Sequence, residues 1–380
     1  MPRPGYADHI AVSATTLNGN EWANLLQVVR STRLSSGEFV ARFERDWADY
    51  IGTEECVTCS SGTTALHLAL LALGVKPGDE VILPTLTFIA TANAVTYCGA
   101  TPVFVDSDPH TWNIDASKLD AAITPRTVGI IAVHLYGQPC DMDALRAIAD
   151  KHGLWIVEDA AQAHGATYQG RRVGSLSDAA TWSFYGNKCL SMGEGGAITT
   201  NRADLAARMR LLRGQGMDPV RRYVHPVVGF NYRLTDLQAA VGVAQLERID
   251  AYLDKRRYLR LRYHELLGAR RDLDFQGRLP NTVKTPWLET VILAHHLNRD
   301  AVADCMAERG VETRPVFVPC HQQSPYAEGA YLPVAERLAR QGLSLPTHAA
   351  MDTIHVEQVC EAVTGAIEAQ KGGHDERANK

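Results

Sequence analysis

The amino-acid sequence predicts an α/β protein, in which a larger domain has a mostly parallel central sheet and a smaller C-terminal domain is α+β. Two observations support this fold class. From about residue 55 to residue 250, short apolar runs alternate with amphipathic stretches, which is typical of a parallel sheet covered by helices. Beyond about residue 270 the elements become shorter and proline-rich connectors join them. With 380 residues, the chain is long enough for two domains.

Apolar runs in the first part of the chain predict the strands of the parallel sheet. They are Glu80–Leu83, Pro102–Val105, Val128–Val133, Leu154–Val157, Ala179–Phe184 and Gly196–Thr199. Helices are predicted between them, at Thr64–Leu73 with Gly74 as its C-cap, and at Met142–His152.

A long helix is predicted from Thr235, because Thr235 and Gln238 have the spacing of a capping box. Its apolar face continues through Leu237, Val241, Ala244, Ile249 and Leu253, so the helix is long enough to bridge two domains. Downstream, Glu289–Leu293 predicts a strand and Ala301–Arg309 a helix. We therefore expect a large domain at residues 1–250 and a small C-terminal domain at residues 251–380.

Composition narrows the class of protein. The formal net charge is −5 and charges of both signs are interleaved, so no basic stripe predicts nucleic-acid binding. The sequence has no apolar signal core at its start and no run of about 18 apolar residues. Of the eight scattered cysteines, Cys56 and Cys59 have CxxC spacing, but no second pair completes a zinc site. We expect a cytoplasmic protein with reduced cysteines, no metal and no membrane contact.

Residues 60–66, SSGTTAL, lead into an apolar helix and predict a phosphate site. A helix N-terminus offers free N–H groups and a positive dipole end, and Gly62 lets the backbone approach a ligand closely. A simple serine N-cap is the alternative. The stretch is not a Walker P-loop, because the chain has no GxxxxGK[ST] motif.

Residues 154–165, LWIVEDAAQAHG, place two acids at the end of an apolar run. Glu158 and Asp159 point to opposite faces of a strand, so only one of them can reach a ligand at the carboxyl end of the sheet. A carboxylate buried there needs a cationic partner, and the protonated nitrogen of a pyridine ring would serve. A solvated loop acid is the alternative for one of the two.

Lys188 lies in the stretch SFYGNKCLSMGEGG, just beyond the predicted strand that contains Ser183. A lysine in a partly desolvated pocket has a lowered pKa and can form a Schiff base, whereas the alternative is a surface charge. Together the three motifs indicate a ligand with a phosphate, a ring nitrogen and an aldehyde, which pyridoxal phosphate combines. A NAD-dependent dehydrogenase would explain the parallel sheet, but it leaves Lys188 without a role and its fingerprint is missing.

The motifs follow one another in a recognisable order: SGTTAL, TFIATANAV, VHLYGQPCDMDAL, EDAAQAHGA, SFYGNK…GEGGAITTN and GFNYRLTDLQAAVG. From about Leu17 to residues 343–348, the chain resembles the DegT/DnrJ/EryC1/StrS family of pyridoxal-phosphate-dependent sugar aminotransferases. The resemblance implies the aspartate-aminotransferase type of fold, fold type I. It also implies pyridoxal 5′-phosphate as cofactor, with pyridoxamine 5′-phosphate as intermediate, and a homodimer with shared active sites.

The resemblance assigns roles to the matching residues. Lys188 is the catalytic Schiff-base lysine, and Asp159 is the partner of the pyridinium nitrogen. The other cofactor-binding residues are Gln162 beside the ring, Phe88 on its face, Gly62, Thr63 and Ser183 at the phosphate, and Asn231 from the neighbouring subunit. His321 matches a position near the sugar nucleotide, where a connector histidine is the alternative.

The implied reaction moves the amino group of L-glutamate to a nucleotide-linked keto-6-deoxysugar. GQGMDPVRRY and VTYCGATPVFVD resemble members that use GDP-4-keto-6-deoxy-D-mannose, although such members can carry Glu where this chain has Gln162. A dTDP-linked 4-keto sugar, a 3-keto-6-deoxyhexose and a non-catalytic regulatory protein that binds the cofactor are the alternatives. The sugar 3-dehydratase branch carries histidine in place of the lysine, so Lys188 argues against it. We hypothesise that Arg221 and Arg222 bind the substrate diphosphate.

Overall fold

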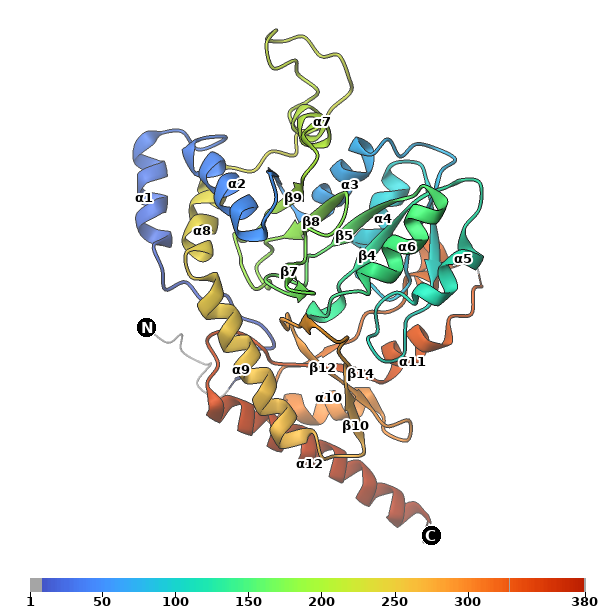
Figure 1. The fold of residues 1–380 in the computed structure, drawn as a ribbon. Coiled ribbons are helices and arrows are strands. Elements are labelled where there is room, and N and C mark those ends of the chain that lie inside the picture. The colour runs from blue at the N-terminus through green and yellow to red at the C-terminus, as the bar shows by residue number, and fades with distance from the viewer. Residues whose placement is uncertain (1–8, 328, 379–380) are drawn as a thin grey trace.

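The computed structural model describes residues 9–327 and 329–378, with a seven-stranded sheet at its centre (Figure 1). The strand order is β1-β9-β8-β5-β4-β2-β3, and every strand except β9 runs in the same direction. The strands are β1 (Glu55–Cys59), β2 (Glu80–Pro84), β3 (Thr101–Val105), β4 (Thr127–Val133), β5 (Trp155–Asp159), β8 (Ala179–Ser183) and β9 (Gly196–Thr200).

The six strands predicted for this sheet are all present, and no end differs from its prediction by more than two residues. The sequence did not predict strand β1. Its residues, ECVTC, have no strong apolar run, and they form a strand because they pair with all five residues of β9. A mostly parallel sheet is therefore confirmed, with β9 as its single antiparallel strand among the seven.

Helices cover both faces of this sheet (Figure 1). Because neighbouring strand residues point to opposite faces, Ala197 and Ile198 of β9 lie in different cores. Ala197 belongs to a core with α2 (Glu38–Ile51) and α8 (Asp236–Leu246), and Ile198 to a core with α3 (Gly62–Ala72) and α7 (Ala203–Arg213). The remaining helices of this part are α1 (Glu21–Ser31), α4 (Ala90–Tyr97), α5 (Leu119–Ala122) and α6 (Met142–His152), with short 3₁₀ helices at Ala116–Lys118 and Leu135–Gly137.

The C-terminal part has its own antiparallel sheet of four strands, in the order β10-β12-β14-β13. Its elements are β10 (Leu273–Phe275), β12 (Glu289–Leu293), α10 (Arg299–Glu308), β13 (Arg314–Pro315), 3₁₀ helices at Cys320–Gln322 and Ser324–Tyr326, α11 (Pro333–Gln341), β14 (Gly342–Leu345) and α12 (Thr353–Ala378). The predicted strand Glu289–Leu293 is confirmed as β12, and the predicted helix Ala301–Arg309 corresponds to α10. A small sheet of β6 (Thr167–Tyr168), β7 (Arg171–Arg172) and β11 (Thr282–Val283) joins the two parts.

The single long helix predicted from Thr235 is wrong, because two helices occupy its place. The capping box is present, with Thr235 Oγ1 accepting a hydrogen bond from the backbone N–H of Gln238. Helix α8 ends at Leu246, and Arg248 has the non-helical angles φ −120° and ψ 5° before helix α9 (Ile249–Leu267) begins. At the break, the Glu247 carboxylate accepts hydrogen bonds from Asn20 and Arg42. We attribute the break to these tertiary contacts, which no local sequence signal announces.

Helix α9 contributes to two cores. Ile249 and Leu253 pack with α2 and α8, whereas Leu259, Tyr263 and Leu267 pack with the C-terminal sheet. The division of the chain at residue 250 therefore stays a prediction.

Membrane spans and metal sites were also predicted to be absent. No helix in the described part of the chain has the length and hydropathy needed to cross a membrane. All eight cysteines are free, and seven of them are buried. Residues 9–327 and 329–378 contain no cluster of three His, Cys, Asp or Glu residues arranged for a metal ion.

Candidate active site

A cavity of about 490 Å³ opens at the carboxyl ends of strands β5 and β8, beside the N-terminus of helix α3. Seven of the residues singled out in the sequence line it: Gly62, Thr63, Phe88, Asp159, Gln162, Ser183 and Lys188. They come from four separate motifs that span more than a hundred residues of sequence. The fold therefore brings these seven of the eight predicted cofactor residues together in one place.

The N-terminus of helix α3 forms one end of the cavity. Ser61 caps the helix through Thr64 in a capping box, so the serine N-cap considered for this motif is present. The N–H groups of Gly62 and Thr63, in the first turn, have no carbonyl four residues earlier in the helix to bond. A Cβ on Gly62 would lie 2.8 Å from the Cβ of Ser183, so glycine is what lets the Ser183 hydroxyl approach this helix end. Free N–H groups, a hydroxyl and the helix dipole together fit a phosphate.

Glu158 points away from the cavity and is completely buried. Its carboxylate accepts four hydrogen bonds, from His134 Nε2, the N–H of Gly174, the N–H of Leu176 and the Ser177 hydroxyl. Burial alone would raise the pKa of Glu158, but these donors, His134 first among them, hold it below its usual value. Glu158 is therefore a satisfied structural anion.

Asp159, on the opposite face of β5, lines the cavity. It accepts hydrogen bonds from Thr91 Oγ1 at 2.8 Å and from the N–H of Ala161 at 3.2 Å. Burial raises its pKa, and the Thr91 hydrogen bond and the nearby Lys188 charge offset this only in part. An under-compensated carboxylate of this kind fits a cationic group in the cavity, such as a protonated ring nitrogen.

Lys188 is half-buried and lines the cavity. Its Nζ lies 4.0 Å from the centroid of the Trp287 ring, within the range of a cation–π contact. Burial lowers the pKa of Lys188 to about 8, while the Asp159 carboxylate acts in the opposite direction. Near neutral pH this amine therefore loses its proton far more readily than a surface lysine.

The loop that carries Lys188 is held from two sides. Trp287 Nε1 donates a 2.7 Å hydrogen bond to the carbonyl of Asn187, which also accepts one from the Ser13 hydroxyl. Thr15 donates to the carbonyl of Gly186. Two distant parts of the chain, the N-terminal segment and Trp287, which lies 99 positions downstream of Lys188, therefore fix the backbone that carries the lysine.

Gln162 and Phe88 complete the walls of the cavity. The backbone N–H of Tyr136 donates to Gln162 Oε1 at 2.9 Å, so the amide NH₂ of Gln162 is left to serve a ligand. Tyr136 makes this bond from a left-handed backbone, with φ 52°. Phe88 is 55% exposed, and its ring centroid lies 6.0 Å from that of Phe317. An exposed aromatic face at a cavity fits a flat ring stacked against it.

Four predicted residues do not reach this cavity within the chain. Arg221, Arg222 and Asn231 lie on the loop between α7 and α8, which projects away from the sheet (Figure 1), and all three are exposed. Arg221 pairs with Asp218 at 3.0 Å. His321 is 4% exposed and its Nδ1 lies 2.7 Å from Thr85 Oγ1, outside the lining.

Sequence reasoning missed several residues of the lining, among them Tyr185, Asn187, Glu194, Trp287, Arg314 and Phe317. Tyr185, Asn187 and Glu194 stand in the quoted lysine stretch, so proximity to Lys188 was a usable signal. Trp287, Arg314 and Phe317 come from the C-terminal part, where no motif marks them. Arg314 adds a positive charge to a cavity that already contains Lys188.

Known proteins resemble this chain over most of its length. A family profile described as the DegT/DnrJ/EryC1/StrS aminotransferase family matches residues 15–364. A GDP-perosamine synthase from Caulobacter vibrioides is 51% identical over 369 residues, which cover 93% of this chain and 97% of that protein.

Solved structures have the same fold. DesV from S. venezuelae, in complex with a ketimine intermediate, is 41% identical with a TM-score of 0.87 and covers 90% of this chain and 93% of that one. DesI in the presence of its TDP-sugar product is 34% identical with a TM-score of 0.90 and covers 98% and 96%. The large parallel sheet with a smaller C-terminal sheet is thus the aspartate-aminotransferase-like fold type I, and the chain belongs to the DegT/DnrJ/EryC1/StrS aminotransferase family.

Proposed function

We propose that this protein transfers the amino group of L-glutamate to GDP-4-keto-6-deoxy-D-mannose and so produces GDP-perosamine. The observation that carries the aminotransferase chemistry is the single cavity in which Lys188, Asp159 and the N-terminus of α3 meet. The choice of sugar is supported by the 51% identical relative named GDP-perosamine synthase. The aminotransferases of this family depend on pyridoxal phosphate.

The residues of the cavity would hold pyridoxal phosphate by complementary contacts. Gly62, Thr63 and Ser183 would hold the phosphate, Asp159 would pair with the ring nitrogen, and Phe88 would cover a ring face. When bound, the cofactor supplies an aldehyde that accepts the amino group and a ring that withdraws electrons from the reacting carbon. Asp159 supports this withdrawal, because its carboxylate keeps a proton on the ring nitrogen.

Lys188 has two tasks in this scheme. It holds the resting cofactor through its amine, and once released it moves a proton from the donor carbon and later delivers one to the sugar carbon. A pKa of about 8 suits both directions, because the amine can accept and return a proton near neutral pH.

Arg314 gives the cavity a binding group for anions. Arg314 lies in strand β13. Its guanidinium forms a 3.7 Å ion pair with Glu312, and 40% of the Arg314 side chain is exposed. Both substrates are anionic, since glutamate carries carboxylates and the sugar carries a diphosphate. We assign Arg314 to a carboxylate of the amino donor, which must approach Lys188 closely.

A second copy of the chain completes the site in this proposal. The loop between α7 and α8 that carries Arg221, Arg222 and Asn231 also exposes large apolar side chains, including Val220 at 89% and Val228 at 88%. Such a loop is stabilised when another surface covers it. We propose a homodimer in which Asn231 reaches the partner's cofactor phosphate and the two arginines reach the sugar diphosphate.

Mass spectrometry of the products tests the function. Protein loaded with pyridoxal phosphate should convert GDP-4-keto-6-deoxy-D-mannose and glutamate into the amino sugar nucleotide, and Lys188→Ala should not. Faster turnover of a dTDP-linked 4-keto or 3-keto sugar would show that this sugar is the substrate, and the proposed transamination chemistry would still hold. Cofactor binding without turnover of any sugar in the panel would favour a regulatory protein instead.

A further inference from the structure

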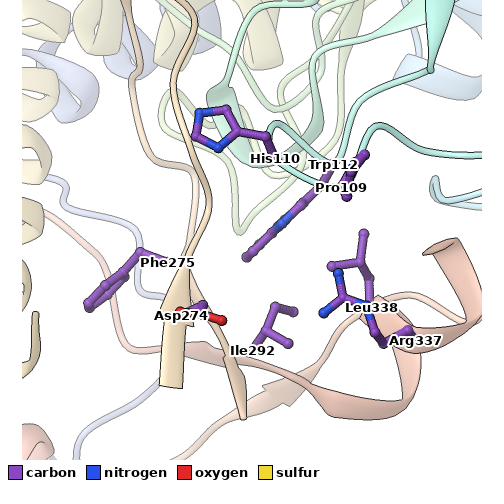
Figure 2. Close-up of a pocket in the computed structure, with 8 residues that line it drawn as sticks. All are labelled: Pro109, His110, Trp112, Asp274, Phe275, Ile292, Arg337 and Leu338. Atoms are coloured by element: carbon purple, nitrogen blue, oxygen red, sulfur yellow. The ribbon is translucent and has the colours of Figure 1, made fainter. Parts of the chain in front are cut away.

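A second cavity, of about 240 Å³, lies between the two sheets and shares no lining residue with the first (Figure 2). One wall is the loop of residues 106–114 that follows β3. The opposite wall consists of strands β10 and β12 and helix α11. The cavity therefore sits where two parts of the chain meet, a common location for small-molecule sites.

Trp112 forms the wall on the loop side, with an unusual backbone. Its φ of 64° is left-handed, a conformation that bulky residues rarely adopt unless their surroundings impose it. The loop is fixed by a 2.8 Å hydrogen bond from Trp112 N to the Asp108 carbonyl and by one from Gln276 Nε2 to the Thr111 carbonyl. Trp112 is only 3% exposed as a residue, and its indole N–H donates no hydrogen bond to a described residue. This N–H is therefore left free to donate to a ligand in the cavity.

Two opposite charges flank the same space, the half-buried Arg337 and the exposed Asp274. Figure 2 shows Arg337 of α11 on one side and Asp274 of β10 on the other. In the described part of the chain neither forms an ion pair or a side-chain hydrogen bond. Asp272, two residues before Asp274, pairs with both Arg270 and Lys371. The remaining walls include the apolar side chains of Ile292 and Leu338.

We propose that this cavity binds a free α-amino acid with an apolar side chain. The carboxylate takes the guanidinium of Arg337 and the indole N–H of Trp112, and the ammonium takes Asp274. The apolar side chain lies against Ile292 and Leu338. A volume of 240 Å³ is below the usual range for drug-sized ligands and suits a molecule of this size.

The charges of Arg337 and Asp274 favour an amino acid over a ligand that has only a carboxylate or only an amine. A carboxylate without an amine would meet the negative Asp274, and an amine without a carboxylate would meet the positive Arg337. Only a zwitterion provides a partner for both charges, and its body supplies apolar surface for the remaining walls.

The test compares three probes by calorimetry on the cofactor-loaded protein: L-leucine, 4-methylpentanoate and 3-methylbutylamine. The last two lack the amine and the carboxylate of leucine, respectively. We expect one leucine per chain and binding at least about tenfold weaker for each of the other probes, because each leaves one charge unpaired.

Variants locate the binding. Arg337→Gln and Asp274→Asn should each weaken leucine binding about tenfold or more, while Arg340→Gln, an exposed arginine of the same helix, should leave it unchanged. Trp112→Phe keeps an aromatic wall and removes the donor, so binding should weaken severalfold. Transamination activity, which uses other residues, shows whether each variant is folded.

Three results would overturn the proposal. One is the absence of leucine binding at millimolar concentration. Another is equal affinity for leucine and 4-methylpentanoate. The third is binding that Arg337→Gln does not change, which would place leucine in the first cavity.

Discussion

Two lysines in this protein have a similarly lowered pKa but differ in their access to a cavity. Burial lowers the pKa of both Lys188 and Lys284 to about 8. Lys188 faces a cavity of about 490 Å³, with Asp159 and Trp287 beside it. Lys284 is 3% exposed and lies 3.6 Å from Glu289, without a hydrogen bond from its amine to any described residue. A lowered pKa therefore reports removal from water, and access to a cavity is what distinguishes a reactive lysine.

The surroundings of Lys284 explain why it is structural. Glu289 is completely buried and also receives a hydrogen bond from His264, with Arg260 3.7 Å away. Burial would raise the pKa of Glu289, but the Lys284 charge and these neighbours hold it below its usual value. The group is a closed ion cluster that links α9 to β12.

Removing each lysine gives the sharpest contrast. We expect Lys188→Ala to reduce transamination by about 10⁴-fold or more, because it removes both the attachment point and the proton carrier. Lys284→Met should keep the rate within about threefold of wild type, since its amine reaches no substrate, and should change the melting temperature instead. Steady-state rates and thermal melts of both variants provide the measurement. A comparable loss of rate in folded Lys284→Met would remove the distinction.

We expect the neighbouring carboxylates to differ in the same way, with Asp159 needed for activity and Glu158 for stability. Asp159→Asn should lower kcat/KM by about 10²–10³-fold and leave stability nearly unchanged, because it removes a charge that acts on the ligand. Glu158→Gln should lower the unfolding free energy by about 2–4 kcal/mol, because it places an amide NH₂ among buried donors. Kinetics and urea unfolding of the two variants test this. A loss of kcat/KM in Glu158→Gln together with a loss of stability in Asp159→Asn would instead show that Glu158 faces the ligand.

Chemical labelling can distinguish the solvent accessibility of the Lys188 and Lys284 amines from their pKa values. In protein stripped of cofactor, acetylation of Lys188 should rise with pH around a midpoint near 8, and Lys284 should react far more slowly despite the same pKa. Peptide mass spectrometry reads both sites in one sample. Equal rates at the two lysines would contradict the sealed environment of Lys284.

The same two pKa values predict how stability depends on pH. Each lysine has a pKa of about 8 in the folded protein and an ordinary pKa of 10.5 in the unfolded chain. Between these values the unfolded chain binds more protons, so stability rises as pH increases from 8 to 10.5. Thermal melts of cofactor-free protein across this window should show the rise, and it should be smaller in Lys284→Met.

The smallest expected effect belongs to Trp287. Its ring stabilises the protonated amine of Lys188, so Trp287→Leu should lower the pKa of Lys188 by about one unit, and Trp287→Phe by less. The labelling midpoint measures this shift. A midpoint that stays in place or rises in Trp287→Leu would show that the aromatic face does not hold the amine.

The sequence predicted the cofactor side of the site because its residues follow the ends of strands. Asp159 and Ser183 are the last residues of β5 and β8, and the parallel sheet places both at one edge. The alternation of side chains along β5 predicted that only one of Glu158 and Asp159 could reach a ligand, and the family resemblance then selected Asp159. Local rules and sheet geometry placed the acids at the sheet edge but did not decide between them.

The remaining parts of the site depend on long-range packing. Trp287 meets Lys188 only because the C-terminal part folds back onto the large sheet, and no periodicity encodes that contact. The break between α8 and α9 depends on Asn20 and Arg42, which lie more than 200 residues upstream of Glu247. In the proposed homodimer, Arg221, Arg222 and Asn231 reach the cavity of a second chain, and local sequence patterns do not specify how two chains pack.

Helix α9 has a consequence for how the protein unfolds. Leu253 and Leu259 are six residues apart, about 9 Å along the axis, yet they belong to different cores. Loss of packing in the C-terminal core would fray the helix toward Leu253 and expose the aromatic core beneath α2. Because one helix packs in both cores, we expect the two sheets to unfold together on heating, in a single cooperative transition.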